Sequence, residues 1–333
     1  MPDNPKITVF MPMFNAEKFI GEAVDSILNQ TFKDFELLII DDGSNDQSRE
    51  IVEKYQDSRI RLYVNERNRG LPYTRNRGLE LARGKYLAVM DADDISDPYR
   101  LAKQWNYMEN HPETVVLASG KDLLTEEDNI HDSYGIKEKL YSFLFYRTSQ
   151  QIGINLIFEN IISNSTTMIR LSFLMQHKIY YNSQCFVMQD YELWTQIFAN
   201  GGQFHILREA LVKYRSNQNN ITTRTRENVK EKRRMLQRMI QKNYLQMLGY
   251  QLDEKWLKLI EECGKEYEEK QNIDTNFYLQ QLYMFFEKLI GEYPAECVIQ
   301  KCQMINFLRK KYFLFSLKSG EKGKNLKRTL QIR

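Results

Sequence analysis

The sequence predicts an α/β fold, in which a mostly parallel sheet flanked by helices is followed by an α-helical C-terminal region. Five short apolar runs rich in β-branched residues occur in the first 120 residues, and a helical pattern separates each from the next. Such alternation is typical of parallel sheets with helices on both faces. From about Asn228 onward, aromatic, Leu and Met residues recur at helical spacing, which predicts the helical region.

The expected strands and helices follow one another in a regular order. The apolar runs predict strands at 7–11, 35–40, 60–64, 86–90 and 115–118. Helices are expected near 17–29, 46–56, 71–82 and 98–110. Beyond these, the pattern predicts strands at 166–170, 204–207 and 211–214 and helices at 137–146 and 189–200. The polar run at 216–220 reads as a loop, so the chain is expected to divide into regions 1–220 and 221–333.

Composition excludes several classes of protein. A chain of 333 residues with 42% hydrophobic and 27% charged residues can bury a substantial core. No segment approaches the roughly 18 apolar residues of a spanning helix, and the N-terminus lacks a signal-peptide pattern. The cysteines show neither the paired spacing of a zinc site nor the density of a disulfide scaffold: Cys185, Cys263, Cys297 and Cys302. A cytoplasmic protein is therefore expected.

The net charge of +3 conceals a basic tail. Residues 301–333 contain ten Lys or Arg and one acidic residue, a net charge of +9, so the first 300 residues carry −6. Aromatics interleave with these basic residues, and no nucleic-acid-binding module is recognisable. We therefore expect the tail to bind an anionic membrane surface rather than nucleic acid, with a solvated surface helix as the competing interpretation. The C-terminal helices are also the expected surface for any homo-oligomer.

Polar residues follow three of the apolar runs. Phe14 and Asn15 follow the first run, Asp41 to Ser44 follow the second, and Asp91 to Asp94 follow the fourth. Ligands of parallel sheets bind at the carboxyl ends of the strands, so these turns predict a site at one edge. Acidic turns at one edge repel one another, and a divalent cation among them, Mn²⁺ or Mg²⁺, is the simplest remedy. An isolated D-x-D triplet such as 91–93 is more often an ordinary turn, so its context decides.

That context resembles family 2 glycosyltransferases. The segments ITVFMPMFN (7–15), SILNQTF (26–32) and FELLIIDDGS (35–44) resemble the opening of the family. NRG (68–70), RNRG (75–78), GKY (84–86) and MDADD (90–94) follow in the family's order and spacing, and QDYELW (189–194) is similar to its later acidic motif. The resemblance covers about residues 6–216.

The resemblance implies a GT-A fold, with a nucleotide-sugar half at about 1–120 and an acceptor half at about 121–220, and a reaction that inverts the anomeric centre. By the same resemblance, Asp42 accepts the N3–H of uracil, Pro12 and Asn15 shape the loop around the base, and Phe14 packs against it. For Phe14, simple packing in the protein core is the competing interpretation.

The resemblance also assigns the residues around the diphosphate. Arg75 is expected to bind it, since a planar guanidinium can contact two oxygens. Asp91 is expected to contact the ribose or the metal shell, and Asp93 to bind the metal directly. Arg215 is a second expected contact of the diphosphate, although solvated arginines are common at strand ends.

Asp190 is the expected catalytic base, which would take the proton of the acceptor hydroxyl. The residue before it departs from the family, because Gln189 stands where most members carry an acid. An amide cannot act as a base, so the role is concentrated on Asp190. The competing interpretation is that Asp190 caps the helix that starts there.

Two other functions compete with a nucleotide-sugar transferase that acts in polysaccharide, lipid-linked glycan or glycoprotein glycan synthesis. A nucleotidyltransferase or dinucleotide-dependent oxidoreductase would use a similar sheet, but the oxidoreductase needs a Gly-rich turn after the first strand, where this chain has Met13 to Ala16. A sugar-nucleotide-binding protein with impaired catalysis is the second alternative. Gln189 supports it, and the presence of Asp91, Asp93 and Asp190 argues against it.

Overall fold

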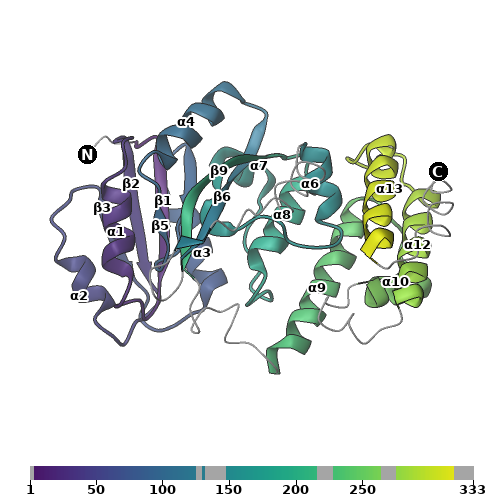
Figure 1. The fold of residues 1–333 in the computed structure, drawn as a ribbon. Helices are drawn as coiled ribbons and strands as arrows, with labels where there is room; N and C mark the ends of the chain where they lie inside the picture. The colour runs from purple at the N-terminus through teal and green to yellow at the C-terminus, as the bar shows by residue number, and fades with distance from the viewer. Residues whose placement is uncertain (1–3, 125–129, 132–147, 216–227, 264–274, 319–333) are drawn as a thin grey trace. The chain divides into compact units, whose positions relative to one another are not determined.

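The structure, a computed structural model, describes residues 4–124, 130–131, 148–215, 228–263 and 275–318. The chain divides into two compact units (Figure 1). Unit 1 comprises Met1–Leu144, Ile162–Leu193 and Gly202–Arg224, and unit 2 comprises Phe145–Ile161, Trp194–Gly201 and Thr225–Arg333. Unit 2 thus takes in two segments that precede residue 220, where the sequence placed the division. The helix expected at 137–146 and the loop expected at 216–220 lie outside the described residues.

Unit 1 is built on a mixed, mostly parallel sheet, as predicted. Strands β1 (Ile7–Met13), β2 (Phe35–Asp41), β3 (Ile60–Val64) and β4 (Tyr86–Val89) pair in parallel. The order across the described part of the sheet is β3-β2-β1-β4-β8-β6-β9-β5, with β7 paired to β6. The other strands are β5 (Ile95–Ser96), β6 (Thr114–Leu124), β7 (Ile130–His131), β8 (Met168–Arg170) and β9 (Gln203–Arg215).

The two strands expected at 204–207 and 211–214 form the single strand β9, so that prediction was wrong. Alongside β6, the register shifts from Ala118 opposite Ile206 to Gly120 opposite Ala210. A β-bulge of this kind places extra unpaired residues on one strand, here β9, and the pairing resumes after them. The exposed residues Arg208 and Glu209, which interrupt the apolar pattern, lie in this irregular stretch. The strand therefore continues where local hydrophobicity predicts a break.

Helices cover both faces of the parallel strands. On one face, α1 (Ile20–Leu28), α2 (Ser48–Glu53) and α4 (Arg100–Asn110) share a core with alternate residues of β1, among them Val9 and Met11. Phe10 points to the opposite face, because successive side chains of a strand alternate. There it meets α3 (Leu71–Leu81), where a Cβ on Gly78 would lie 2.5 Å from the Phe10 ring. Glycine at this position therefore permits the close approach of helix and strand.

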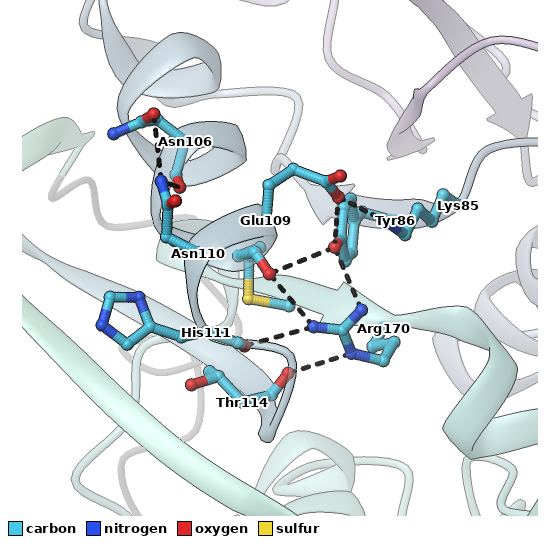
Figure 2. Close-up of polar contacts among 9 residues, drawn as sticks. Lys85, Tyr86, Asn106, Glu109, Asn110, His111, Thr114 and Arg170 are labelled. Carbon is cyan, nitrogen blue, oxygen red and sulfur yellow. Dashed lines mark hydrogen bonds and ion pairs between the residues drawn. The ribbon is translucent and has the colours of Figure 1, made fainter.

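A polar network braces the edge at which β4 begins (Figure 2). The Arg170 guanidinium donates to the Tyr86 hydroxyl at 3.0 Å and to backbone carbonyls of Met108, His111 and Thr114 at 3.2, 3.3 and 3.1 Å. Two of these carbonyls belong to the end of α4, where helical C=O groups lack intrahelical partners. Arg170 therefore ties the last turn of α4 to the start of β4, at the edge away from the strand carboxyl ends.

Unit 2 is helical. Its helices are α6 (Ser149–Asn155), α9 (Asn228–Met247), α10 (Glu254–Cys263), α12 (Thr275–Gly291) and α13 (Lys301–Lys318). An aromatic core joins them: Trp256 lies against Phe285 with ring centroids 5.6 Å apart, and Phe286 against Tyr312 at 6.4 Å. The apolar pattern from Asn228 onward predicted a helical region here, beyond the end of the family resemblance.

Helix α13 corrects part of the expectation for the basic tail. Phe307 and Tyr312 are buried in unit 2, and so is Lys311, whose ammonium lies 3.3 Å from a carboxylate oxygen of Glu159. These aromatic side chains are therefore core residues rather than free groups that insert into a membrane. Residues 319–333 lie outside the described part. No helix within the described ranges combines the length and the apolar character needed to cross a bilayer.

Candidate active site

The three polar turns lie at one edge of the unit 1 sheet. Register pairs Met13 with Asp41 and Phe10 with Val89, so β1, β2 and β4 end on the same side. Phe14 and Asn15 continue from β1, Asp42 from β2, and the acidic turn from β4. The site edge that the sequence predicted is therefore formed by the fold of unit 1.

Asp42 is the most tightly held carboxylate of this edge. Its side chain is buried and accepts a hydrogen bond of 2.7 Å from the Asn65 amide. The backbone N–H groups of Arg69 and Gly70 donate to it at 2.9 Å each. Asp42 thus shapes the loop after β3, and its position within the β2 turn is fixed from three sides.

The loop after β1 is exposed. Phe14 is 44% exposed, which rules out the competing interpretation that it is a core residue. Asn15 has a φ of +49°, a conformation that asparagine tolerates, and its side-chain oxygen accepts from the Asn45 backbone at 2.9 Å. Pro12 lies buried within β1. An exposed aromatic ring beside a buried carboxylate acceptor can form the two contacts that a nucleobase requires.

The acidic turn after β4 combines exposed and buried carboxylates. Asp91 and Asp93 are partly exposed, whereas Asp94 is buried and accepts from the Arg215 backbone N–H at 3.0 Å. Burial raises the pKa of Asp94 well above its usual range, and the charges of Asp91 and Asp93 raise it further. The turn therefore presents two carboxylates outward and holds the third inside the protein.

Cations of the chain itself also lie among these acids, for which the sequence suggested a divalent cation as the simplest remedy. Arg100 is completely buried and donates to the Val89 carbonyl at 2.8 Å. Burial lowers the pKa of Arg100 to about 10, while Asp94 and Asp91 act in the opposite direction. Lys121 of β6 lies in the field of the same two acids and of Asp190, and burial lowers its pKa as well.

Arg75, the expected diphosphate ligand, is almost fully buried. Its Nη2 lies 3.5 Å from an Asp91 carboxylate oxygen. In the amide orientation that satisfies both its donor and its acceptor, Gln189 accepts from Arg75 Nη1 at 2.9 Å. The guanidinium therefore bridges the acidic turn and the segment that precedes Asp190.

Arg215 is also buried, and the protein engages its guanidinium. Nη2 lies 2.5 Å from a carboxylate oxygen of Glu22 in α1, and Nε donates to the Asp93 carbonyl at 3.1 Å. The ring of Phe19 lies 4.6 Å from the guanidinium carbon. Arg215 thus braces the acidic turn against α1, and its contact with a diphosphate stays a prediction.

Asp190 lies in the first turn of α8 (Gln189–Ala199). Because the helix begins at Gln189, Asp190 is inside it rather than at the N-cap, which weakens the capping interpretation. Its charge acts on Lys121 and on the buried Tyr181, whose pKa is raised to about 12, chiefly by burial. The carboxylate therefore belongs to the same electrostatic cluster as the acidic turn.

The donor set of the acidic turn fits a hard divalent cation. Asp91 and Asp93 offer carboxylate oxygens at a rigid strand end, the ligands that Mg²⁺ and Mn²⁺ prefer. Within the part of the chain that the structure describes, no three His, Cys, Asp or Glu side chains converge as a complete metal site. Two carboxylates suit an ion that takes its other ligands from phosphate and water.

Sequence reasoning did not identify Arg100, Lys121, Asn76 or Tyr181 as parts of this edge. No local sequence pattern distinguishes Arg100 or Lys121 from a solvated charged residue. Asn76 lies inside a segment that resembles the family, which was the one available signal. Each of the four is placed by contacts far along the chain.

The mostly parallel sheet of unit 1, flanked by helices, is the fold of GT-A glycosyltransferases. Residues 8–211 match the model of the family described as Glycosyl transferase family 2. An uncharacterized glycosyltransferase of Methanocaldococcus jannaschii is 36% identical over 230 residues, which cover 68% of this chain and 76% of the relative. The O-antigen biosynthesis glycosyltransferase WbnJ of Escherichia coli is 31% identical, with 63% and 79% covered.

Solved structures support the same fold. The structure of S. aureus TarS 1-349 in complex with UDP-GlcNAc aligns with a TM-score of 0.59 and 19% identity, covering 98% of this chain and 90% of that one. At this identity the likeness shows the fold alone. The chain belongs to glycosyl transferase family 2, so it is a glycosyltransferase.

Proposed function

We propose that this enzyme transfers a hexose or N-acetylhexosamine from a UDP-linked donor to an acceptor hydroxyl, with inversion and with dependence on Mn²⁺ or Mg²⁺. The observation that carries the proposal is the gathering of Asp42, Asp91, Asp93 and Asp190 in unit 1, around the carboxyl ends of β1, β2 and β4. Asp42 supplies an acceptor suited to uracil, and the UDP-GlcNAc complex of the TarS structure supports a uridine donor.

In the proposed reaction Asp190 takes the proton from the acceptor hydroxyl, and the oxygen attacks the anomeric carbon from the side opposite the diphosphate. The bond from that carbon to the diphosphate oxygen breaks, and UDP leaves with the electron pair. A single displacement inverts the anomeric centre. A divalent cation held by Asp93 and Asp91 would supply neutralisation of the charge that develops on the diphosphate.

The acceptor is proposed to be a growing polysaccharide, a lipid-linked glycan or a glycoprotein glycan. WbnJ, whose name assigns it to O-antigen biosynthesis, supports the first two of these classes. A cytoplasmic enzyme that reaches a lipid-linked acceptor would benefit from resting on an anionic membrane face, and the basic residues of 301–333 other than the buried Lys311 are the proposed contact. Any homo-oligomer is proposed to form through the helices of unit 2.

Donor hydrolysis tests the proposal most directly. Wild-type enzyme is incubated with a panel of UDP-, GDP- and dTDP-sugars, with Mn²⁺ or with a chelator, and release of the nucleotide is measured. We expect release from one or more UDP-sugars in the presence of the metal only. Binding of UDP-sugars without release or transfer would favour the sugar-nucleotide-binding protein with impaired catalysis.

A further inference from the structure

The segment that leads to Asp190, the proposed catalytic base, is held by side-chain contacts rather than by strand or helix hydrogen bonds. Residues 179–188 connect α7 (Leu171–His177) to α8 and contain no regular element. Yet Tyr181 is fully buried in this segment, and Met188 adopts a φ of +61° just before the helix. A non-glycine residue in that conformation needs surrounding contacts that maintain it.

Asn76 of α3 makes two contacts that hold this segment at Tyr181. Its side-chain nitrogen donates to the Tyr181 carbonyl at 2.8 Å, and its side-chain oxygen accepts from the Tyr181 N–H at 2.8 Å. One carboxamide thus pairs with both backbone groups of a residue 105 positions further along, as a neighbouring strand would. Buried backbone groups must find partners, and here one side chain satisfies both.

Arg75, the neighbour of Asn76 in α3, contacts the same segment at two further points. Its guanidinium carbon lies 5.4 Å from the centre of the Tyr181 ring. Its Nη1 donates to Gln189, whose own amide donates to the Cys185 and Phe186 carbonyls at 3.2 and 3.3 Å. The third contact of the guanidinium is Asp91, 3.5 Å away in the acidic turn.

We infer that Arg75 and Asn76 form a clamp that fixes the segment before α8, and with it Asp190, relative to Asp91. Both are positioning residues: Arg75 links the acidic turn to Gln189, and Asn76 locks the backbone at Tyr181. The inference rests on the proposed function, because it assigns the clamp to the geometry between the base and the donor site.

The clamp explains why an uncharged side chain, Gln189, can stand where most members of the family carry an acid. An amide at this position accepts one hydrogen bond from Arg75 without adding a second carboxylate to compete with Asp91. Arg75 Nε has no hydrogen-bond partner among the described residues, so the two terminal nitrogens make its polar contacts. Asp91 is therefore the carboxylate that pairs with the buried Arg75 guanidinium.

Asn76→Ala and Asn76→Asp test the clamp, with Asn110→Ala as the matched control at an exposed position of α4. Hydrogen exchange at the Tyr181 amide should accelerate about tenfold or more in Asn76→Ala, because its acceptor is lost, and in neither of the others. Turnover should fall roughly 10- to 100-fold in Asn76→Ala through misplacement of the base, with little change in the donor KM. Asn76→Asp, which keeps the acceptor, should retain more turnover than Asn76→Ala.

Thermal unfolding of each variant shows whether the fold survives. Unchanged protection of Tyr181 in Asn76→Ala would overturn the clamp. Faster exchange with turnover equal to that of Asn110→Ala would overturn the positioning role. If wild type releases no nucleotide from any sugar nucleotide, the proposed function fails, and the exchange measurement still decides whether the clamp exists.

Discussion

The Asp42 carboxylate accepts a hydrogen bond of 2.7 Å from the side-chain amide of Asn65, which lies 23 residues further along the chain. The Asn65 amide and the backbone N–H groups of Arg69 and Gly70 together occupy three of the roughly four acceptor positions of the carboxylate. One position is left for a ligand, and the three existing bonds fix its direction. Asp42 is therefore preorganised as a single acceptor.

Asp42→Asn should weaken UDP binding about tenfold or more. All three partners of Asp42 are N–H donors, so the amide nitrogen of Asn would face one of them and leave that buried N–H group without an acceptor. Isothermal titration with UDP measures the change. Asp34→Asn, at a partly exposed carboxylate in the loop before β2, serves as the control and should bind UDP as wild type does. If Asp42→Asn binds UDP with the affinity of wild type, the uracil ring is recognised by other residues.

Asp93→Ala should abolish transfer and remove the dependence on metal, because it deletes a proposed ligand at a strand end that contributes little to the core. Nucleotide release is measured while Mn²⁺ is titrated, and binding of Mn²⁺ is followed separately by electron paramagnetic resonance. Asp34→Ala is the matched control. Turnover by Asp93→Ala at the wild-type rate in the presence of a chelator would disprove the metal hypothesis.

Asp190→Asn should keep donor affinity and lose transfer by a factor of roughly 10² or more, the scale of a lost general base. Steady-state kinetics with saturating donor separate the two effects. If the variant loses donor binding but keeps its rate at saturation, Asp190 is a binding residue.

Gln189→Glu distinguishes an active enzyme from an impaired one. The Gln189 amide contacts Arg75 and two backbone carbonyls, so it is turned toward the protein. We expect Gln189→Glu to lower turnover roughly 10-fold or more in the same assay, because a carboxylate cannot donate to the two carbonyls and would compete with Asp91 for Arg75. A large gain of transfer activity in this variant would instead show that the natural glutamine impairs catalysis.

Arg170→Met should lower the free energy of unfolding of unit 1 by about 2–4 kcal/mol, because it removes the four hydrogen bonds that the guanidinium donates to the Tyr86 hydroxyl and to backbone carbonyls around the end of α4 (Figure 2). Urea denaturation measures the loss. Arg49→Met removes an exposed pair with Glu53 and should change the same quantity by about 0.5 kcal/mol or less. Comparable losses in both variants would argue against the bracing role of Arg170.

The prediction that the basic tail binds a membrane should be tested by removing fewer residues than the whole of 301–333. Removal of everything after Gln300 would delete Phe307 and Tyr312 from the core of unit 2. A chain that ends at Lys318 loses five basic residues and one acidic residue, and keeps α13. It should sediment less with phosphatidylserine vesicles, since each basic residue near the surface contributes about 1 kcal/mol.

High salt should release the full-length chain from the vesicles, because exposed charges are screened. Vesicles of neutral lipid are the control and should bind neither chain. The shortened chain should still hydrolyse its donor, since the proposed site residues lie in unit 1. Equal sedimentation of both chains with anionic vesicles would exclude residues 319–333 as the anchor.

Local pattern was enough to predict the parallel strands and the edge where the site lies. A short apolar run rich in β-branched residues favours a buried strand, and the polar turn after such a strand lies at its end, so Asp42 and Asp93 are placed by their neighbours in sequence. The strand at 60–64 agrees with β3 residue for residue. The same reasoning failed at β9, because pairing with β6 continues the strand across polar residues that break the pattern.

The sequence by itself thus determined which residues stand at the site edge and to which family the chain is similar. Only the tertiary structure decided what holds them: the burial of Arg75 against Gln189 and of Arg100 among the acids. It also decided that Lys311 is buried in unit 2. The physical reason is that a charged residue has the same local signature whether it is solvated or buried. Its state depends on partners such as those that Arg75 and Asn76 find more than 100 residues away, and these meet only in the folded chain.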